Sequence, residues 1–145
     1  MTNEPSEEVV VVRRVIAAPR ERVFAAWLDP VSLAKFMQPG DVTVATAEVD
    51  ARVGGNFRIV MQHKLDVAEH WGWYREIEPP SLLSFTWISK YTDLQETLVT
   101  IELRDHDGDT ELTLTHRGLP KRTFDAHREG WSDIVRVQDE MMRAA

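Results

Sequence analysis

Alternating apolar and polar positions dominate the middle of the chain and predict consecutive β-strands. Residues 57–63 carry Phe, Ile, Met and His at every second position, which is the period of a strand with one buried face. Asp107-Gly108 is typical of a two-residue hairpin turn between two such runs. Because the connections are short, we expect an antiparallel meander. Five further segments are predicted as its strands: 42–49, 68–78, 83–87, 97–103 and 112–116.

The N-terminal part of the chain predicts one strand and two short helices. Residues 9–17 are mostly β-branched, as expected of a strand. Pro19 suits the first turn of a helix, and apolar residues follow it at helical spacing. Asp29 and Pro30 can end this helix and begin the next one, with Asp29 as the N-cap and Pro30 at the first helical position.

A long amphipathic helix is predicted from about residue 123 to residue 145. Gly130 lies inside it, where glycine costs about 1 kcal/mol relative to alanine. Such a glycine usually has a packing reason, so we expect a strand or a ligand to approach it closely. One stripe of the helix contains Phe124, His127, Trp131, Ile134, Val135, Gln138, Met141 and Met142.

These elements predict an α+β fold with the order β-α-α-β-β-β-β-β-β-α. A curved antiparallel sheet has one face to cover, and the long helix is the only large apolar element available to cover it. We therefore expect the sheet to wrap around the C-terminal helix, with an internal cavity where one helix cannot fill the space. Residues 9–145 are expected to form a single domain, and residues 1–8 a disordered N-terminal tail.

Composition and charge argue against several classes of function. The net charge is −7 over 145 residues, and nucleic-acid binding rests on phosphate neutralisation, so we expect no nucleic-acid partner. No apolar run reaches the roughly 20 residues of a membrane span. Residues 1–8 lack the pattern of a signal peptide, so we expect a cytoplasmic protein. The chain has no cysteine, and its five histidines lack the spacing of a helical zinc motif, so neither a metal nor another cofactor is expected.

Aromatic, methionine and histidine side chains provide the strongest functional lead. The chain has five Trp, five Phe and five Met, which would line a cavity well, although a place in the core is the simpler interpretation for most of them. The histidines are interpreted either as satisfied or half-exposed side chains, or as donors of hydrogen bonds to a bound carbonyl or carboxylate. The candidate lining comprises Phe57, Met61, His63, Trp73, Arg75, Phe85, Trp87, Val99, Leu114, His116, His127 and Trp131.

The third strand of the meander leaves open which of its faces points inward. One face would present Trp73, Arg75 and Ile77 to the helix, and the other would present His70 and Tyr74. A bulge could reconcile the two arrangements. If Arg75 points inward, it would be a buried cation that needs an anionic group, and hence a candidate to bind a ligand carboxylate.

Six stretches of the chain carry a family resemblance. They are R-V-I-A-A-P at 14–19, R-E-R-V-F-A-A-W-L-D-P at 20–30, V-G-G-N-F-R at 53–58, G-W-Y-R-E-I-E-P-P-S-L-L-S-F-T-W at 72–87, T-E-L-T-L-T-H-R-G-L at 110–119 and H-R-E-G-W at 127–131. In this order they resemble the START-like (SRPBCC, helix-grip) superfamily, and more narrowly its branch homologous to the activator of the heat-shock-protein-90 ATPase.

The resemblance implies a helix-grip fold with an internal cavity, in a single-domain, bacterial-type member. The co-chaperone that gives the branch its name has a further N-terminal domain, which we expect to be absent because the first strand begins at about residue 9. Members of the superfamily share no catalytic motif, so the resemblance implies no catalytic residue.

The sequence favours one function and leaves two alternatives open. We expect the cavity to bind a small, largely apolar or amphipathic molecule, which His63, His116, His127 or Arg75 would orient. The first alternative is a protein-interaction module of the co-chaperone kind, and the second is a small-molecule cyclase or hydrolase that uses the same cavity. A homodimer and a chaperone partner are left open.

Overall fold

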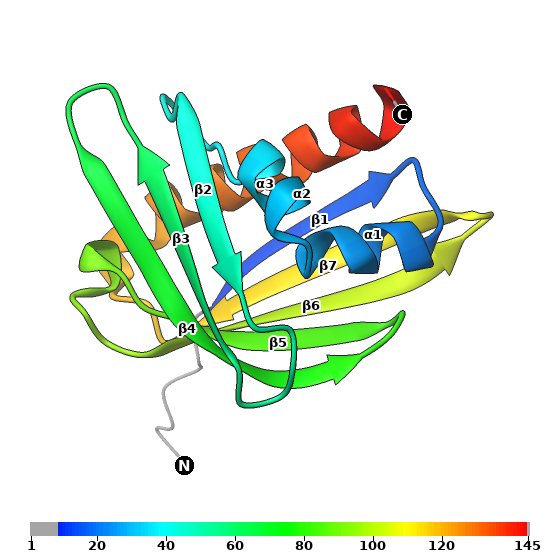
Figure 1. The fold of residues 1–145 in the computed structure, drawn as a ribbon, viewed down its shortest axis with the longest axis horizontal. Coiled ribbons are helices and arrows are strands. Elements are labelled where there is room, and N and C mark those ends of the chain that lie inside the picture. The colour runs from blue at the N-terminus through cyan, green and yellow to red at the C-terminus, as the bar shows by residue number, and fades with distance from the viewer. Residues whose placement is uncertain (1–8, 145) are drawn as a thin grey trace, which may run out of the picture.

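The computed structural model describes residues 9–144, over which the chain forms seven β-strands, three α-helices and two short 3-10 helices (Figure 1). The strands are β1 (Val10–Ile16), β2 (Val44–Val49), β3 (Asn56–Gln62), β4 (Val67–Glu78), β5 (Leu82–Trp87), β6 (Thr97–His106) and β7 (Asp109–Arg117). The helices are α1 (Arg20–Trp27), α2 (Pro30–Phe36), α3 (Phe124–Ala144), η1 (Lys90–Thr92) and η2 (Lys121–Thr123). The predicted tail at residues 1–8 lies outside the described residues.

The described strands form one antiparallel sheet in the order β1-β7-β6-β5-β4-β3-β2. Strands β2 to β7 follow one another as a meander, which confirms that prediction. β1 pairs with β7, so the first strand lies at the opposite edge from β2. The sheet curls, and α3 runs along its inner side (Figure 1). The predicted α+β fold with a sheet wrapped around the C-terminal helix is therefore confirmed.

Two local sequence signals act as predicted. The carboxylate of Asp29 accepts a hydrogen bond from the backbone N–H of Ser32 at 3.0 Å and so caps α2, which begins at Pro30. Asp107 and Gly108 have φ angles of 52° and 91°, as a type I′ turn between β6 and β7 requires. These residues fix where α2 begins and where the last hairpin turns.

Strand β4 contains a bulge that determines which side chains point inward. His70 and Tyr74 are 5% and 3% exposed, whereas Trp73 is 45% exposed. The pairing with β5 shifts register between Tyr74 and Glu76, and after this shift Ile77 packs against the core. The two arrangements considered from the sequence are thus reconciled by the bulge.

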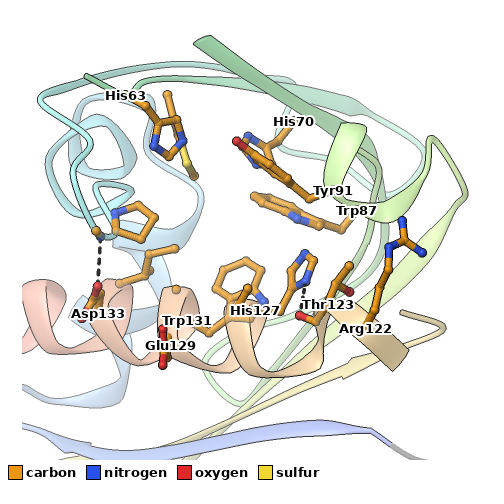
Figure 2. A pocket seen from close by; sticks show the side chains of 16 residues that line it. His63, His70, Trp87, Tyr91, Arg122, Thr123, His127, Glu129, Trp131 and Asp133 are labelled. Atoms are coloured by element: carbon orange, nitrogen blue, oxygen red, sulfur yellow. Dashed lines mark hydrogen bonds between the residues drawn. The ribbon is translucent and has the colours of Figure 1, made fainter. Parts of the chain in front are cut away.

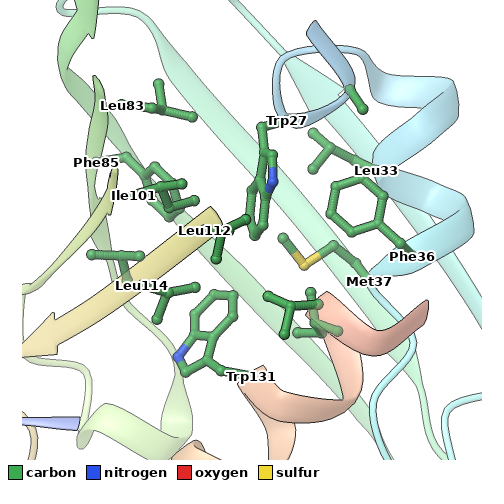
Figure 3. Close-up of a cluster of buried hydrophobic side chains, with 14 of the residues drawn as sticks. Trp27, Leu33, Phe36, Met37, Leu83, Phe85, Ile101, Leu112, Leu114 and Trp131 are labelled. Carbon is green, nitrogen blue, oxygen red and sulfur yellow. The ribbon is translucent and has the colours of Figure 1, made fainter. Parts of the chain in front are cut away.

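The core fills one end of the space between the sheet and α3. Trp27 of α1 meets Phe36 of α2 edge to face, with ring centroids 5.0 Å apart. Its indole N–H donates to the side-chain oxygen of Gln138 on α3 at 3.0 Å. Figure 3 shows Trp27 and Phe36 within the cluster that also contains Phe85 and Leu114 from the sheet. α1 and α2 therefore close this end of the molecule against α3.

Asp139 fastens the C-terminal half of α3 to the chain around β1. Its buried carboxylate accepts a hydrogen bond from the backbone N–H of Ala17 at 2.9 Å and pairs with Arg14 at 3.1 Å and Arg143 at 3.2 Å. Burial alone would raise the pKa of Asp139, but these hydrogen bonds outweigh it and hold the pKa below its usual value.

Within residues 9–144, no helix is both long and apolar enough to cross a membrane.

Gly72 lies in β4 where β5 comes too close for a side chain. A Cβ atom at this position would lie 2.0 Å from the carbonyl oxygen of Thr86. We expect Gly72→Ala to lower the free energy of unfolding by about 3 kcal/mol or more, because the two strands would have to separate. Urea unfolding followed by circular dichroism measures the loss.

Gly130→Ala is the matched control for this prediction. A Cβ atom at Gly130 would meet only the Cβ of Pro39 within 4 Å, at 3.9 Å. We expect this substitution to raise the free energy of unfolding by up to about 1 kcal/mol, because alanine favours the helix over glycine. Equal stability of Gly72→Ala and the unsubstituted chain would contradict the close approach of β4 and β5.

Candidate functional site

A cavity of about 440 Å³ lies between the sheet and the N-terminal half of α3 (Figure 2). Its volume falls within the range of about 300–1,000 Å³ that is typical of small-molecule sites. Strands β3, β4 and β5 supply Met61, His70 and Trp87 to one wall, and α3 supplies Trp131 and Ile134 to the other. The loop after α2 and the two 3-10 helices form the rim.

Aromatic rings form the inner surface of the cavity. The indoles of Trp87 and Trp131 are almost fully buried, with ring centroids 4.9 Å apart. The imidazole of His70 lies 4.8 Å from the Trp87 ring, and the ring of Tyr91 from η1 lies 6.2 Å from His70. This series of rings gives a largely apolar surface against which a flat molecule can stack.

His116 links the indole of Trp131, through Thr97, to the backbone of Trp87. The indole N–H of Trp131 donates to His116 Nδ1 at 3.0 Å, so the proton of the uncharged ring is on Nε2. That Nε2 lies 2.7 Å from the hydroxyl oxygen of Thr97, and the Thr97 hydroxyl donates to the carbonyl oxygen of Trp87. Burial lowers the pKa of His116 to about 3. Both ring nitrogens are thus used inside the protein, and the structure leaves His116 no hydrogen bond for a ligand.

His63 and His127 lie at the cavity with one ring nitrogen bonded to the protein. Nδ1 of His127 lies 3.0 Å from the carbonyl oxygen of Thr123, one helical turn earlier. Nδ1 of His63 lies 2.7 Å from a carboxylate oxygen of Asp41, and this hydrogen bond lowers the pKa of Asp41. Burial lowers the pKa of His127, with the Thr123 carbonyl opposing the shift. Nε2 of His63 is buried and has no hydrogen-bond partner within residues 9–144.

His70 is the most buried of the cavity histidines. It is 5% exposed, and its Nδ1 has no hydrogen-bond partner among the described residues. Burial lowers the pKa of His70 to about 4, partly opposed by the backbone of Ile59. The ring is therefore uncharged at neutral pH. Buried polar atoms without a partner are rare in proteins, so this nitrogen needs an explanation.

Ion pairs tie η1 to its neighbours at the rim. Lys90 pairs with Asp66 in the β3–β4 connection, and Arg122 of η2 pairs with Asp93 just after η1. These pairs are exposed, so each contributes little to stability. They hold η1, and with it Tyr91, over the edge of the cavity (Figure 2).

The cavity brings together five of the twelve residues expected to line it: Met61, His63, Trp87, His127 and Trp131. Four others lie in the hydrophobic core: Phe57, Phe85, Val99 and Leu114. The structure places Trp73 and Arg75 on the outer face of β4, where Arg75 pairs with Glu96 at 3.5 Å. Arg75 is therefore not a buried cation and cannot bind a carboxylate inside the cavity.

Sequence reasoning missed the rim residues Tyr91 and Arg122, which belong to 3-10 helices that no periodicity reveals. A signal for η1 does exist, because Ser89 and Thr92 form a capping box around it. Gly130 lines the cavity. The sequence predicted either a strand or a ligand close to this glycine, and the cavity provides the place for a ligand. Among the described residues no strand approaches Gly130, since only Pro39 lies within 4 Å of the position of a Cβ.

Comparison with known proteins identifies a family. Residues 17–141 match the family described as Activator of Hsp90 ATPase homolog 1-like protein. Among the curated proteins, none matches the chain significantly.

Solved structures of bacterial proteins share the fold. A protein of Chromobacterium violaceum is 27% identical, with a TM-score of 0.85 over 92% of this chain and 96% of its own. A protein of Arthrobacter aurescens is 21% identical, with a TM-score of 0.83 over 99% of this chain and 91% of its own. A protein of Nitrosomonas europaea is 21% identical, with a TM-score of 0.81 over 97% of each chain.

The buried histidines predict that the protein loses stability in mild acid. An unfolded histidine takes up a proton below about pH 6.5, whereas folded His70 does so only near pH 4. Its contribution to stability is complete above pH 6.5 and is lost as the pH falls toward 4. Between pH 7 and pH 5 the free energy of unfolding should fall in both chains. We expect this fall to be about 2 kcal/mol smaller in His70→Phe than in the unsubstituted chain. Urea unfolding at both pH values measures this difference.

His106→Gln is the control, because His106 is exposed at the β6–β7 hairpin. We expect this variant to lose as much stability between pH 7 and pH 5 as the unsubstituted chain does. The same loss in His70→Phe would show that His70 is not buried in its uncharged form.

Proposed function

Because the chain belongs to the family of Activator of Hsp90 ATPase homolog 1-like proteins, we propose that it binds a small, largely apolar molecule in the cavity between its sheet and α3. The observation that carries the proposal is a pair of buried imidazole nitrogens, Nε2 of His63 and Nδ1 of His70. Both belong to residues that line the cavity, and neither has a hydrogen-bond partner within residues 9–144. An unsatisfied buried polar atom costs about 1–3 kcal/mol, which a bound molecule with suitable polar groups offsets.

The walls of the cavity support a ligand that is mostly apolar. Trp87, Trp131, Met61 and Ile134 present rings and aliphatic groups to it, while the polar groups lie at separate points. Sites that bind small molecules commonly combine an apolar lining with a few placed polar groups that fix orientation. A chaperone partner, a homodimer and a reaction in the cavity stay predictions from the sequence.

A larger side chain at Gly130 should fill part of the cavity and weaken the binding of an apolar probe. We expect the fluorescence of the uncharged dye N-phenyl-1-naphthylamine to rise when it binds the unsubstituted chain. Gly130→Leu should weaken this binding at least about tenfold, because the leucine side chain occupies the space toward Pro39. Leucine is also a better helix former than glycine, so α3 should persist.

Ser132→Leu is the matched control, because Ser132 is exposed on the other side of α3. It adds the same side chain outside the cavity and should leave dye binding unchanged. Equal dye binding by Gly130→Leu and the unsubstituted chain would refute the cavity as the binding site.

A further inference from the structure

Two cavity histidines are bonded to the protein through the same ring nitrogen. Nδ1 of His127 contacts the carbonyl oxygen of Thr123, and Nδ1 of His63 contacts the carboxylate of Asp41. Carbonyl and carboxylate oxygens only accept hydrogen bonds, so each Nδ1 must carry a proton and donate it. In an uncharged imidazole the other nitrogen, Nε2, then bears a lone pair. Burial lowers the pKa of His127, so its ring is uncharged at neutral pH and its Nε2 is an acceptor.

We infer that the cavity selects an uncharged ligand with a hydroxyl group, whose hydrogen bond is accepted by Nε2 of His127. This inference rests on the proposed function, because it names the class of ligand for the same cavity. A hydroxyl suits the site in both its roles, since it donates and also accepts. Trp87 also lines the cavity (Figure 2), and an indole N–H is a donor of the kind that a hydroxyl oxygen accepts.

A carboxylate fits this cavity poorly. It only accepts hydrogen bonds, so it would meet a lone pair at His127. Arg122 is the only lysine or arginine among the described lining residues, and it already pairs with Asp93. Glu129 adds a further negative charge to the lining. An anionic ligand would therefore be taken out of water without a free counter-charge.

The same geometry argues against one of the two interpretations of the histidines from the sequence. In that interpretation they donate hydrogen bonds to a bound carbonyl or carboxylate, which requires a proton on the nitrogen that faces the ligand. At His127 that proton is used for Thr123, and burial holds the pKa of the ring below its usual value. His127 is therefore uncharged at neutral pH, and its free nitrogen accepts.

Three probes that share the naphthalene ring system test the inference on the whole chain. They are 2-naphthol, 2-methoxynaphthalene and 2-naphthoate, and isothermal titration calorimetry at neutral pH measures their affinities. We expect 2-naphthol to bind about tenfold more tightly than its methyl ether, which keeps the ring and the acceptor oxygen but cannot donate. We expect 2-naphthoate to bind more weakly than 2-naphthol.

His127→Phe keeps a flat ring and removes the acceptor nitrogen. In this variant the preference for 2-naphthol over the methyl ether should fall to about twofold or less. His106→Phe is the control, because this exposed histidine lies in the β6–β7 hairpin, and it should keep the full preference.

The outcomes separate this inference from the proposed function. Equal affinities for 2-naphthol and its ether, tighter binding of 2-naphthoate, or a preference that survives in His127→Phe would overturn the inference while leaving cavity binding intact. If none of the three probes binds the folded, unsubstituted chain, the proposed function fails and takes the inference with it.

Nuclear magnetic resonance tests the same inference without a substitution. Long-range ¹H–¹⁵N spectra of the labelled chain report which nitrogen of each imidazole carries the proton. We expect Nδ1 to be protonated and Nε2 to be free in His127. A proton on Nε2 of His127 would overturn the inference even if the phenylalanine variants fail to fold.

Discussion

The hydrogen-bond chain through His116 determines how α3 sits on the sheet. It runs from Trp131 on α3 to His116 on β7, then to Thr97 on β6 and the backbone of Trp87 on β5. It can form only when the imidazole is uncharged, because one nitrogen must accept from Trp131 while the other donates to Thr97. The same hydrogen bonds hold the indole of Trp131 and the backbone of Trp87, and the rings of both residues wall the cavity. The position of the N-terminal half of the helix and the shape of the binding site therefore depend on one buried side chain.

The rest of α3 is attached in a different way, and this explains where the cavity lies. Toward its C-terminus the helix carries Gln138, which meets Trp27, and Asp139, which binds the chain around β1. α1 and α2 fill the space on that side with aromatic side chains. Toward its N-terminus no second helix layer exists within the described residues, and His127 and Trp131 line the open cavity there (Figure 2). The cavity is the part of the curved sheet that the short helices do not reach.

Local patterns in the sequence predicted most of the fold. The alternation along the strands, the cap at Asp29 and the turn at Asp107 each act over a few residues and need no knowledge of distant partners. The pairing of β1 with β7 could not be predicted, because alternation identifies a buried face but not the neighbouring strand. The outward position of Trp73 and Arg75 depends on a bulge that only the register with β5 reveals.

The candidate site was less predictable for a related reason. Phe57 and Met61 share one face of β3, yet only Met61 lies at the cavity, since the difference is set by where α1 and α2 pack. Tyr91 lies in an irregular connection whose placement depends on ion pairs with distant residues. The hydrogen-bonding roles of His63 and His127 follow from their partners, which the sequence alone does not identify.

Gly130 has a consequence for how proteins of this kind can diverge. It is the point at which the main chain of α3 passes the cavity without a side chain between them. Nearly any other residue there would favour the helix while reducing the room for a ligand, so selection for stability and selection for ligand size act on this position in opposite directions. A single substitution at this position could thus change which molecules the cavity binds without changing the fold of the sheet and the helix.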